Sequence, residues 1–344
     1  MKKATRICLL WMAVLFVPVM VSGCKTAPQD TIRIGFFPNL THSQAVYGYA
    51  NGDFERAFGK GTTVKWLSFN AGPSEIEAMF AGEVDIGYIG PTPAINGYEK
   101  SGGDLKIIAG ATLNGALLVT REDLKLDSVN SLEGRVIAVP QFGNTQHLCL
   151  LNILSNNGIK TVENGGTTQI IESSNPDIKT LMDKGDIDAA LVPEPWATRL
   201  VEEIHANILL DSDHVWDSGD SCTALIIVDR KFYEQHRDQV AVFLRTHLEI
   251  TNAINENPEQ AMVKINDKIG ELTGSKLDET VLVKSFSNLV VTVDPGVSSI
   301  DTYMTIFENE GILSGIKDRD NIYDFSVLNG ILKEKSLPEI GGAR

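Results

Sequence analysis

Two similar stretches decide the fold: MFAGEVDIGYIGP at residues 79–91 and MDKGDIDAALVPE at residues 182–194. In each stretch, a glycine that can cap a helix is followed by an acidic residue, a short apolar strand and a loop that contains proline. Asp85 and Asp188 take equivalent positions at the starts of the two strands. Copies that lie about a hundred residues apart predict two similar lobes rather than a solenoid of short repeats.

The alternation of strand and helix patterns extends outward from both stretches. This alternation predicts an α/β protein with a mostly parallel sheet and helices on both faces. The expected strands are 31–37, 64–69, 84–89, 106–111, 116–120, 135–139, 168–172 and 187–192. The expected helices are 43–58, 73–81, 91–100, 145–156, 176–184 and 195–205.

The last third of the chain is expected to return to the first lobe. A strand at 224–228 leads into helical patterns that continue to residue 287. Lobe 1 would then consist of residues 31–118 plus 226–344, and lobe 2 of residues 119–225. The chain would cross between the lobes at Leu118–Glu122 and Ser221–Val228. Such a two-crossing hinge would let the lobes close on a ligand.

The N-terminus has the pattern of a bacterial lipoprotein signal. Lysine and arginine residues precede an apolar run at 7–21, and small residues lead directly into Cys24. We predict a lipoprotein signal peptide at 1–23, a lipid-modified Cys24 and a polar tether at 24–30. The exported chain would be anchored by this lipid alone to the outer face of the cytoplasmic membrane, or lie in the periplasm. The alternative is an ordinary signal peptide that ends near a cysteine.

Composition excludes some partners and leaves the cysteines open. The chain of 344 residues has a formal charge of -15, and an acidic protein repels phosphate backbones, so nucleic acid is not an expected partner. A hydrophobic content of 43% is typical of a packed globular protein. Cys149 and Cys222 could pair in an exported protein or remain two buried thiols. No spacing typical of a metal site occurs, and we expect no metal.

Four segments carry a resemblance to a known family. They are IGFFPNLTHSQA at 34–45, GYIGPTPA at 87–94, VPQFGNTQ at 139–146 and VPEPWA at 192–197. Together they resemble the nitrate, aliphatic sulfonate and taurine group of ABC-importer binding proteins, which is related to thiamine-pyrimidine-binding proteins. The resemblance implies a type II periplasmic-binding-protein fold whose two Rossmann-like lobes close on a small ligand and then dock on a permease with its ATPase. We further expect a monomer with no enzymatic activity and no cofactor.

Each of the four segments runs from a strand end into a helix start, where ligands bind in open α/β sheets. Helix N-termini attract anions, because they present unpaired N–H groups and a partial positive charge. The segments contain no Lys or Arg, so amides and hydroxyls would hold a sulfonate or nitrate better than a phosphate, which favours bidentate Arg. The expected ligand-binding residues are Asn39, Thr41, His42, Gln44, Gly90, Pro91, Thr92, Asn114, Phe142, Gly143, Asn144, Thr145, Gln146, Glu194 and Trp196.

Several alternatives stay open at this point. The Ser, Thr and Asn residues of these loops could serve only as helix caps. Glu194 could cap the next helix, or it could accept the ammonium group of an amino-sulfonate such as taurine. Trp196 could wall the cleft or pack in the core. A thiamine-type pyrimidine precursor is the alternative ligand, and a sensory lipoprotein is the alternative role. The sequence contains no P-loop, nucleophile elbow or zinc-protease motif, which argues against an enzyme.

Overall fold

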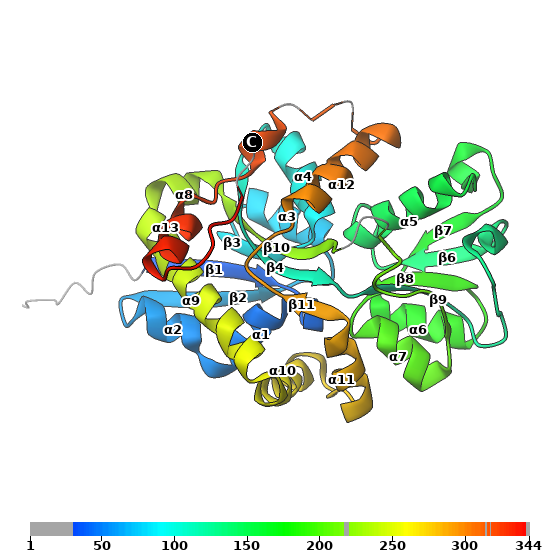
Figure 1. Ribbon diagram of the computed structural model, residues 1–344, viewed down its shortest axis with the longest axis horizontal. Helices are drawn as coiled ribbons and strands as arrows, with labels where there is room; N and C mark the ends of the chain where they lie inside the picture. Colours follow the sequence, from blue (N-terminus) through cyan, green and yellow to red (C-terminus); the bar gives the residue numbers. More distant parts are fainter. Residues whose placement is uncertain (1–29, 217–219, 314, 317, 342–344) are drawn as a thin grey trace, which may run out of the picture.

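The computed structural model describes residues 30–216, 220–313, 315–316 and 318–341, which form two α/β lobes side by side (Figure 1). The predicted signal peptide at 1–23, the lipid-modified Cys24 and the tether up to residue 29 lie outside the described residues. Within the described residues, no helix combines the length and the apolar character needed to cross a bilayer.

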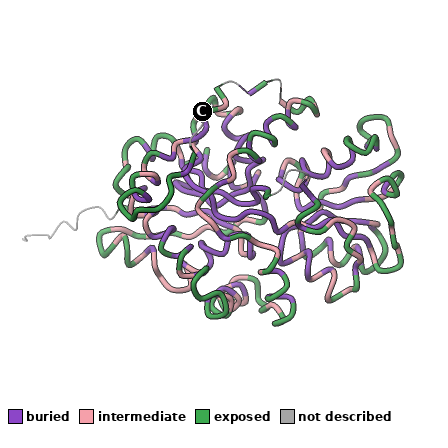
Figure 2. Tube along the Cα trace, in the orientation of Figure 1, coloured by how far each residue is buried: buried purple, intermediate pink, exposed green. Residues whose placement is uncertain are grey.

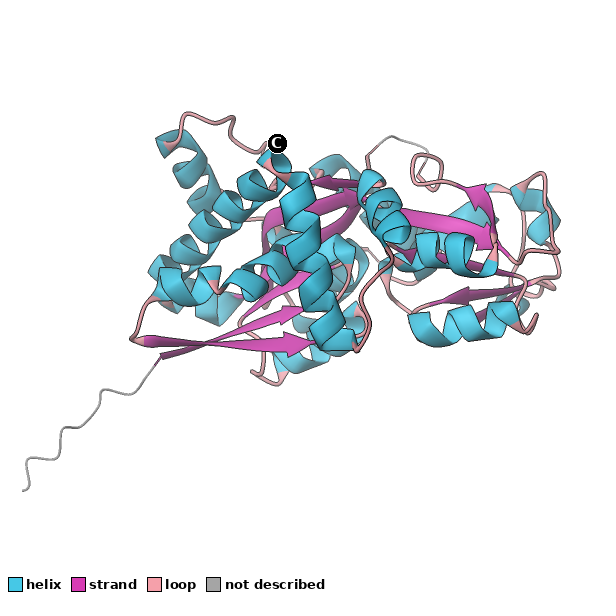
Figure 3. Cartoon of the chain, turned by 90° about the horizontal axis from the view of Figure 1, so that it is seen from below, coloured by secondary structure: helices cyan, strands magenta, loops and turns pink. Residues whose placement is uncertain are grey.

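Lobe 1 is built on a six-stranded sheet in the order β11 (Leu289–Val291), β4 (Leu105–Asn114), β10 (Cys222–Asp229), β3 (Ile86–Ile89), β1 (Asp30–Phe36) and β2 (Thr62–Ser68). β1 runs parallel to β2 and β3, whereas β10 runs antiparallel to β3 and β4. β3 and β10 are apolar along most of their length because helices cover both faces of the sheet (Figure 3). The helices are α1 (Ser43–Asn51), α2 (Asp53–Phe58), α3 (Gly72–Phe80), α4 (Pro91–Ser101), α8 (Arg230–Gln235), α9 (Arg237–Glu256), α10 (Pro258–Thr273), α11 (Glu279–Ser287), α12 (Val297–Asn309) and α13 (Ser326–Glu334).

Lobe 2 is built on a five-stranded sheet in the order β7 (Gln169–Glu172), β6 (Val136–Val139), β8 (Ala189–Pro193), β5 (Ala116–Thr120) and β9 (Asn207–Leu210). β6 runs parallel to β7 and β8, and β5 runs antiparallel to β8 and β9. The helices are α5 (Thr145–Asn156), α6 (Asn175–Asp183) and α7 (Trp196–Ile204). The predicted α/β fold is therefore confirmed, but the prediction of a mostly parallel sheet is wrong, because five of the nine pairs of named strands in the described residues are antiparallel.

The repeat that the sequence predicts is present in both sheets. Asp85 accepts a hydrogen bond from the backbone N–H of Arg33 at 2.7 Å, and Asp188 accepts one from that of Val136 at 2.9 Å. In each lobe the two residues lie 52 positions apart and join two neighbouring parallel strands. Guanidinium groups accompany both carboxylates, since Arg33 lies 3.3 Å from Asp85 and Arg121 lies 3.6 Å from Asp188. One carboxylate therefore fixes the same strand pair in each lobe.

The first crossing between the lobes lies a few residues earlier than predicted. β4 of lobe 1 ends at Asn114 and β5 of lobe 2 begins at Ala116, so the predicted crossing at Leu118–Glu122 is wrong. Asn114 and Gly115 have φ angles of 63° and 79°, and these two left-handed residues turn the chain between the sheets. The predicted strands 106–111 and 116–120 already leave this turn between them, but their sequences do not show that the second of them joins the other sheet.

The second crossing is displaced in the same direction. Ser221–Val228 is almost wholly β10, which already belongs to the sheet of lobe 1. The chain therefore returns between the end of β9 and the start of β10. Both expected boundaries between the lobes therefore fall inside strands, namely β5 and β10.

Buried residues follow the strands of both sheets, and exposed residues lie on the outer helices and loops (Figure 2). Cys149 and Cys222 are both buried and free, so the unpaired alternative holds. The Cys149 thiol lies 3.3 Å from the Tyr303 hydroxyl, where α5 of lobe 2 contacts α12 of lobe 1. Burial raises the pKa of Cys149 to about 12, which keeps the thiol neutral.

Candidate ligand-binding site

A small cavity of about 30 Å³ lies where the two lobes meet. Its wall is formed by loops that follow strands of both sheets, the place where open α/β folds bind ligands. Lobe 1 contributes Phe37, Asn39, Thr41, His42, Asn70, Ala71, Gly72, Gly90, Pro93 and Thr223, and lobe 2 contributes Pro140, Asn144, Thr145, Gln146, Asn175 and Pro193. Seven residues expected to bind ligand are therefore brought together here: Asn39, Thr41, His42, Gly90, Asn144, Thr145 and Gln146.

His42 is the one titratable side chain among the described residues of this wall, and it is buried. Its Nδ1 accepts a hydrogen bond from the backbone N–H of Phe37 at 3.1 Å, and the two rings stack with centroids 4.3 Å apart. Burial lowers the pKa of His42 to about 3, so the imidazole is neutral near neutral pH. Because Nδ1 is an acceptor, the proton resides on Nε2, which can donate to an anion.

The two lobes touch at Gly90 and Thr145. A Cβ atom on Gly90 would lie 2.3 Å from Thr145 Oγ1, so this approach requires glycine. Thr145 Oγ1 and Asn175 Oδ1 are buried without a hydrogen-bond partner among the described residues. A buried polar atom of this kind costs about 1–3 kcal/mol unless a bound group or water satisfies it. The Thr145 hydroxyl is thus a strong candidate for donating to a ligand.

Helix N-termini supply the positive potential of the cavity. α3 and α4 of lobe 1 begin at its wall at Gly72 and Gly90, and α5 and α6 of lobe 2 begin there at Asn144 and Asn175. Asn144 Oδ1 also caps α5 by accepting from the backbone N–H of His147 at 2.8 Å. No formally charged side chain of the described residues lines the cavity. Neutral donors and helix starts from opposite lobes therefore make a site for a compact anion.

A model of the NMT1-like family matches residues 25–266, which is well over half of the chain. The chain belongs to the NMT1-like family. Taurine-binding periplasmic protein of Escherichia coli (strain K12) is 30% identical to it over 200 residues, which cover 58% of this chain and 60% of that protein. The chain thus spans less than two thirds of this curated relative. The resemblance to the sulfonate and taurine group that the sequence predicted is confirmed.

Solved structures establish the fold of this NMT1-like protein. The alkanesulfonate-binding protein of Xanthomonas axonopodis pv. citri, in a structure bound to MOPS, superposes with a TM-score of 0.70 at 18% identity, covering 85% of this chain and 96% of that one. The periplasmic nitrate-binding protein of Synechocystis PCC 6803 superposes with a TM-score of 0.71 at 14% identity, covering 90% of both chains. The predicted periplasmic-binding-protein fold is therefore confirmed.

Glu194 of this NMT1-like chain does not line the cavity and is fully buried behind it. Thr198 donates to its carboxylate from the backbone N–H at 3.1 Å and from the hydroxyl at 2.8 Å. Asn288 donates to it from Nδ2 at 2.7 Å, and this bond joins lobe 2 to the segment between α11 and β11 of lobe 1. Burial raises the pKa of Glu194, although the bonds from Asn288 and Thr198 oppose the shift. Glu194 therefore caps α7, as one alternative held, and also links the lobes.

Both crossings take part in the same hydrogen-bonded ring. The backbone N–H of Gly115 donates to Ser212 Oγ at 2.8 Å, and Ser212 Oγ donates to the backbone oxygen of Asn288 at 3.2 Å. The backbone N–H of Glu194 donates to the backbone oxygen of Gly115 at 2.8 Å. The Glu194–Asn288 bond closes the ring, so four segments near the hinge are held together.

Two other expected binding residues serve the framework. Gln44 donates from Nε2 to the backbone oxygen of Ala111 at 2.6 Å inside lobe 1. Asn114 donates to Asp220 at 2.9 Å and accepts from the backbone N–H of Ser221 at 2.9 Å, which ties one crossing to the other. The sequence places these residues near loops, but it does not show which way their side chains turn.

The remaining expected residues also lie outside the cavity wall. Pro91 and Thr92 form the first turn of α4, and the Thr92 hydroxyl is buried behind the wall. Phe142 is 47% exposed, and the backbone N–H of Gly143 donates to a histidine of α5 at 3.1 Å. Trp196 lines a wider groove of about 770 Å³ that opens beside the cavity. Trp196 therefore lines the groove beside the cavity, as one alternative held, whereas the start of its helix α7 does not reach the cavity itself.

Sequence reasoning predicted the helices 73–81 and 176–184, but it did not count their starts among the ligand-binding positions. Gly72 opens α3 and Asn175 opens α6, and each is followed by a proline in the first turn. The spacing between these two residues equals the spacing between Asp85 and Asp188. Extension of the repeat to the second helix of each lobe would therefore have found both positions.

Proposed function

We propose that this protein is the extracytoplasmic solute-binding subunit of an ABC importer and that it captures a small oxyanion between its two lobes. An aliphatic sulfonate or taurine is the foremost ligand, and nitrate and bicarbonate are further candidates. The observation that carries the proposal is a small interlobe cavity at which helix starts of both lobes meet without a formally charged side chain among the described residues. Such a site suits a compact anion whose charge is delocalised.

The cavity supports binding rather than chemistry. Its titratable group, His42, has a pKa of about 3 and is paired with a backbone N–H, so it is a poor proton acceptor at neutral pH. The names of the relatives point to the same role, since they are binding proteins for taurine, alkanesulfonate and nitrate. We therefore place the protein among non-enzymatic binding subunits that deliver a ligand to a permease and its ATPase, held at the membrane through a lipid on Cys24.

We expect ligand binding to close the lobes, because each lobe contributes hydrogen-bond donors to the cavity wall. His42 and Asn39 offer donors from lobe 1, and Thr145 and Gln146 offer donors from lobe 2. A ligand that accepts from both sets is bound more tightly by the closed arrangement than by separated lobes, and its binding shifts the population toward closure.

Thermal unfolding of the signal-free protein with a panel of ligands tests the proposal. The panel contains taurine, propanesulfonate, nitrate, bicarbonate and a thiamine-type pyrimidine. A ligand of micromolar Kd at millimolar concentration stabilises by about 4 kcal/mol. Stabilisation by at least one oxyanion supports the proposal, whereas stabilisation by the pyrimidine alone, or by no compound, contradicts it.

Thr145→Val is the matched variant, because valine keeps the shape and removes the hydroxyl. It should weaken oxyanion binding by about tenfold through loss of one donor to a charged group. The ligand-free protein should melt at the same or a higher temperature, since the variant removes a buried hydroxyl without a partner among the described residues. An equal loss of stability and binding would point to a structural role for Thr145.

A further inference from the structure

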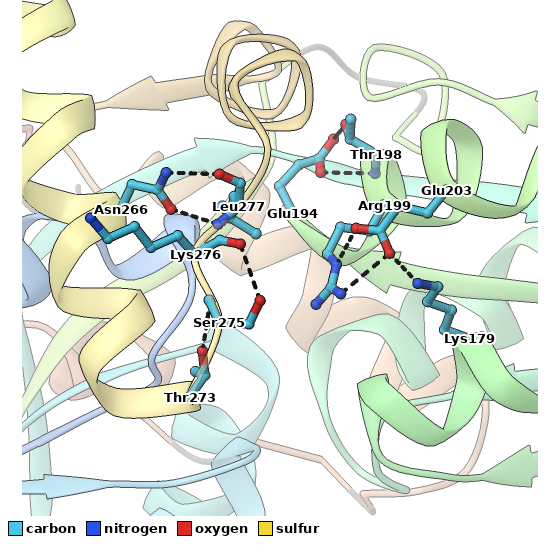
Figure 4. Close-up of polar contacts among 10 residues, drawn as sticks. All are labelled: Lys179, Glu194, Thr198, Arg199, Glu203, Asn266, Thr273, Ser275, Lys276 and Leu277. Atoms are coloured by element: carbon cyan, nitrogen blue, oxygen red, sulfur yellow. Dashed lines mark hydrogen bonds and ion pairs between the residues drawn. The ribbon is translucent and has the colours of Figure 1, made fainter.

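The groove beside the cavity has a charged wall and an uncharged wall. It shares Phe37, Asn39, Asn70 and Asn175 with the cavity, so one molecule can extend from one into the other. Lobe 2 lines the groove with Lys179, Thr180, Asp183, Trp196 and Arg199. Lobe 1 faces them with Ile269, Thr273, Ser275 and Leu277, none of which is charged (Figure 4). Lys276 of that loop turns to Asp267 at 2.7 Å instead.

Two cations of the lobe 2 wall share one carboxylate. Glu203 accepts from Arg199 Nε at 2.8 Å and from Arg199 Nη2 at 3.3 Å, and Lys179 Nζ contacts the same group (Figure 4). Burial acts to raise the pKa of Glu203, but the bonds from Arg199 and Lys179 prevail and lower it, so the group stays ionised. The three side chains together retain one positive charge.

The guanidinium of Arg199 is held in a fixed orientation. It stacks over the Trp196 ring at 4.4 Å, and Glu203 engages its Nε and Nη2. No hydrogen-bond partner of Nη1 is found among the described residues, and this outer edge is free to bind an anion. Asp183 is the one acidic residue of the described groove wall, and it is exposed to water, which screens its charge.

The cations lie a short distance beyond the cavity. Asn175 belongs to both hollows, and Lys179 follows it one turn later on α6, about 6 Å along the helix axis. A head group in the cavity would therefore bring the far end of a short carbon tail close to Lys179 and Arg199. Because the whole chain carries a formal charge of -15, a local positive pair also offsets the repulsion of an incoming anion.

We propose that Arg199 and Lys179 form a second anion subsite, so that the preferred substrates are short sulfonates with a carboxylate or second sulfonate at the far end. This inference rests on the proposed function, since the first sulfonate must occupy the cavity. The inference also narrows the proposed ligands: the ammonium tail of taurine would meet the retained positive charge, so taurine would bind less tightly than propanesulfonate.

Calorimetric titration with a matched pair of ligands tests the inference. Sulfopropanoate and propanesulfonate have the same number of carbons and differ by one carboxylate. Sulfopropanoate should bind about tenfold more tightly, because the added carboxylate gains a charge-assisted contact with Arg199. This preference should shrink in Arg199→Gln, recover in part in Arg199→Lys, and weaken as salt is raised.

Arg245→Gln is the control, because it removes the same charge from an exposed pair with Glu334 on lobe 1. It should leave the ratio of the two affinities unchanged. Equal affinities for the two ligands, or a ratio that survives in Arg199→Gln, would overturn the second subsite while leaving the proposed function intact. Absence of binding by every sulfonate would instead overturn the proposed function. If Arg199→Gln does not fold, Lys179→Gln and the salt dependence of the wild-type ratio decide the question.

Discussion

The loops that follow β3 in lobe 1 and β8 in lobe 2 share a framework and differ in task. Asp85 and Asp188 fix the two strands in the same way. After β3, Gly90 lies at the cavity and against the other lobe, whereas the equivalent residue of lobe 2, Pro193, is the last residue of β8. The next residue of lobe 2, Glu194, turns its carboxylate inward to the ring at the crossings. The two equivalent loops therefore serve different purposes: the loop after β3 lies at the cavity, and the loop after β8 stabilises the crossings between the lobes.

Gly90→Ala should have the largest effect on this comparison. The added Cβ would lie 2.3 Å from Thr145 Oγ1, so the lobes could not approach as they do now. Overpacking of this kind costs about 1–3 kcal/mol, which lowers ligand affinity by about ten- to a hundredfold in a calorimetric titration. Pro193→Ala at the equivalent place should lower affinity far less. Equal losses in the two variants would show that the loops do not differ in this way.

Asp85→Ala and Asp188→Ala should destabilise the protein to a similar extent. Each removes a carboxylate that accepts a backbone N–H and pairs with arginine, which lowers the free energy of unfolding by about 2 kcal/mol. Urea unfolding measures the loss. Asp104→Ala is the control, because Asp104 forms an exposed pair with Arg230 and should cost less than about 1 kcal/mol. A large loss in one lobe alone would argue against an equivalent framework.

Glu194→Gln should destabilise by about 1–2 kcal/mol, because its amide nitrogen would face a backbone or side-chain donor that now binds the carboxylate. Thermal unfolding reports this loss. The ratio of taurine to propanesulfonate affinity should stay the same, since Glu194 does not line the cavity. A selective loss of taurine binding would show that Glu194 holds the ligand ammonium after all.

The smallest effect is expected from pH on ligand affinity. His42 has a pKa of about 3, so affinity should change by less than about twofold between about pH 5.5 and pH 8. A rise in affinity on acidification through pH 6.5 would mean that His42 binds as a cation.

The stability of the folded protein should decrease at acidic pH, although the ligand affinity should not change. His247, which lies between the Tyr88 hydroxyl and the backbone oxygen of Gly110, has a pKa of about 4, also lowered by burial. Below pH 6.5 the unfolded chain binds protons that buried His42 and His247 exclude, so stability falls as pH drops toward about 4 and 3. Urea unfolding at a series of pH values measures this decline.

Local patterns allowed the sequence to predict the framework. Gly82 and Gly185 end their helices with φ angles of 74° and 77°, as their spacing before Asp85 and Asp188 indicates. The alternation of strands and helices predicted an α/β fold and the repeat predicted two lobes, and the loop residues Asn39, Thr41, His42 and Asn144 to Gln146 indeed meet at one cavity. These features depend on residues that are close in the sequence, so local sequence patterns predict them.

Long-range partners could not be predicted in this way. Glu194 meets Asn288, which lies 94 residues away, and Asn114 meets Asp220, which lies 106 residues away. A polar side chain in a loop can point toward the ligand or away from it. Its orientation depends on a hydrogen-bond partner that is distant in the sequence. The lobe of strand 116–120 was assigned wrongly for a related reason, because its partner β8 lies about 70 residues further along the chain.

The position of Trp196 has an experimental consequence. Its indole borders the groove and is covered on one face by Arg199, whereas Trp216 is buried against Tyr303 and Trp66 donates to Glu55 within lobe 1. A ligand tail that enters the groove and contacts the Arg199 guanidinium alters the surroundings of the Trp196 indole and leaves the other two indoles of the described residues unchanged. The protein thus contains its own fluorophore at the mouth of the cleft, and its emission can report the arrival of a ligand without any label.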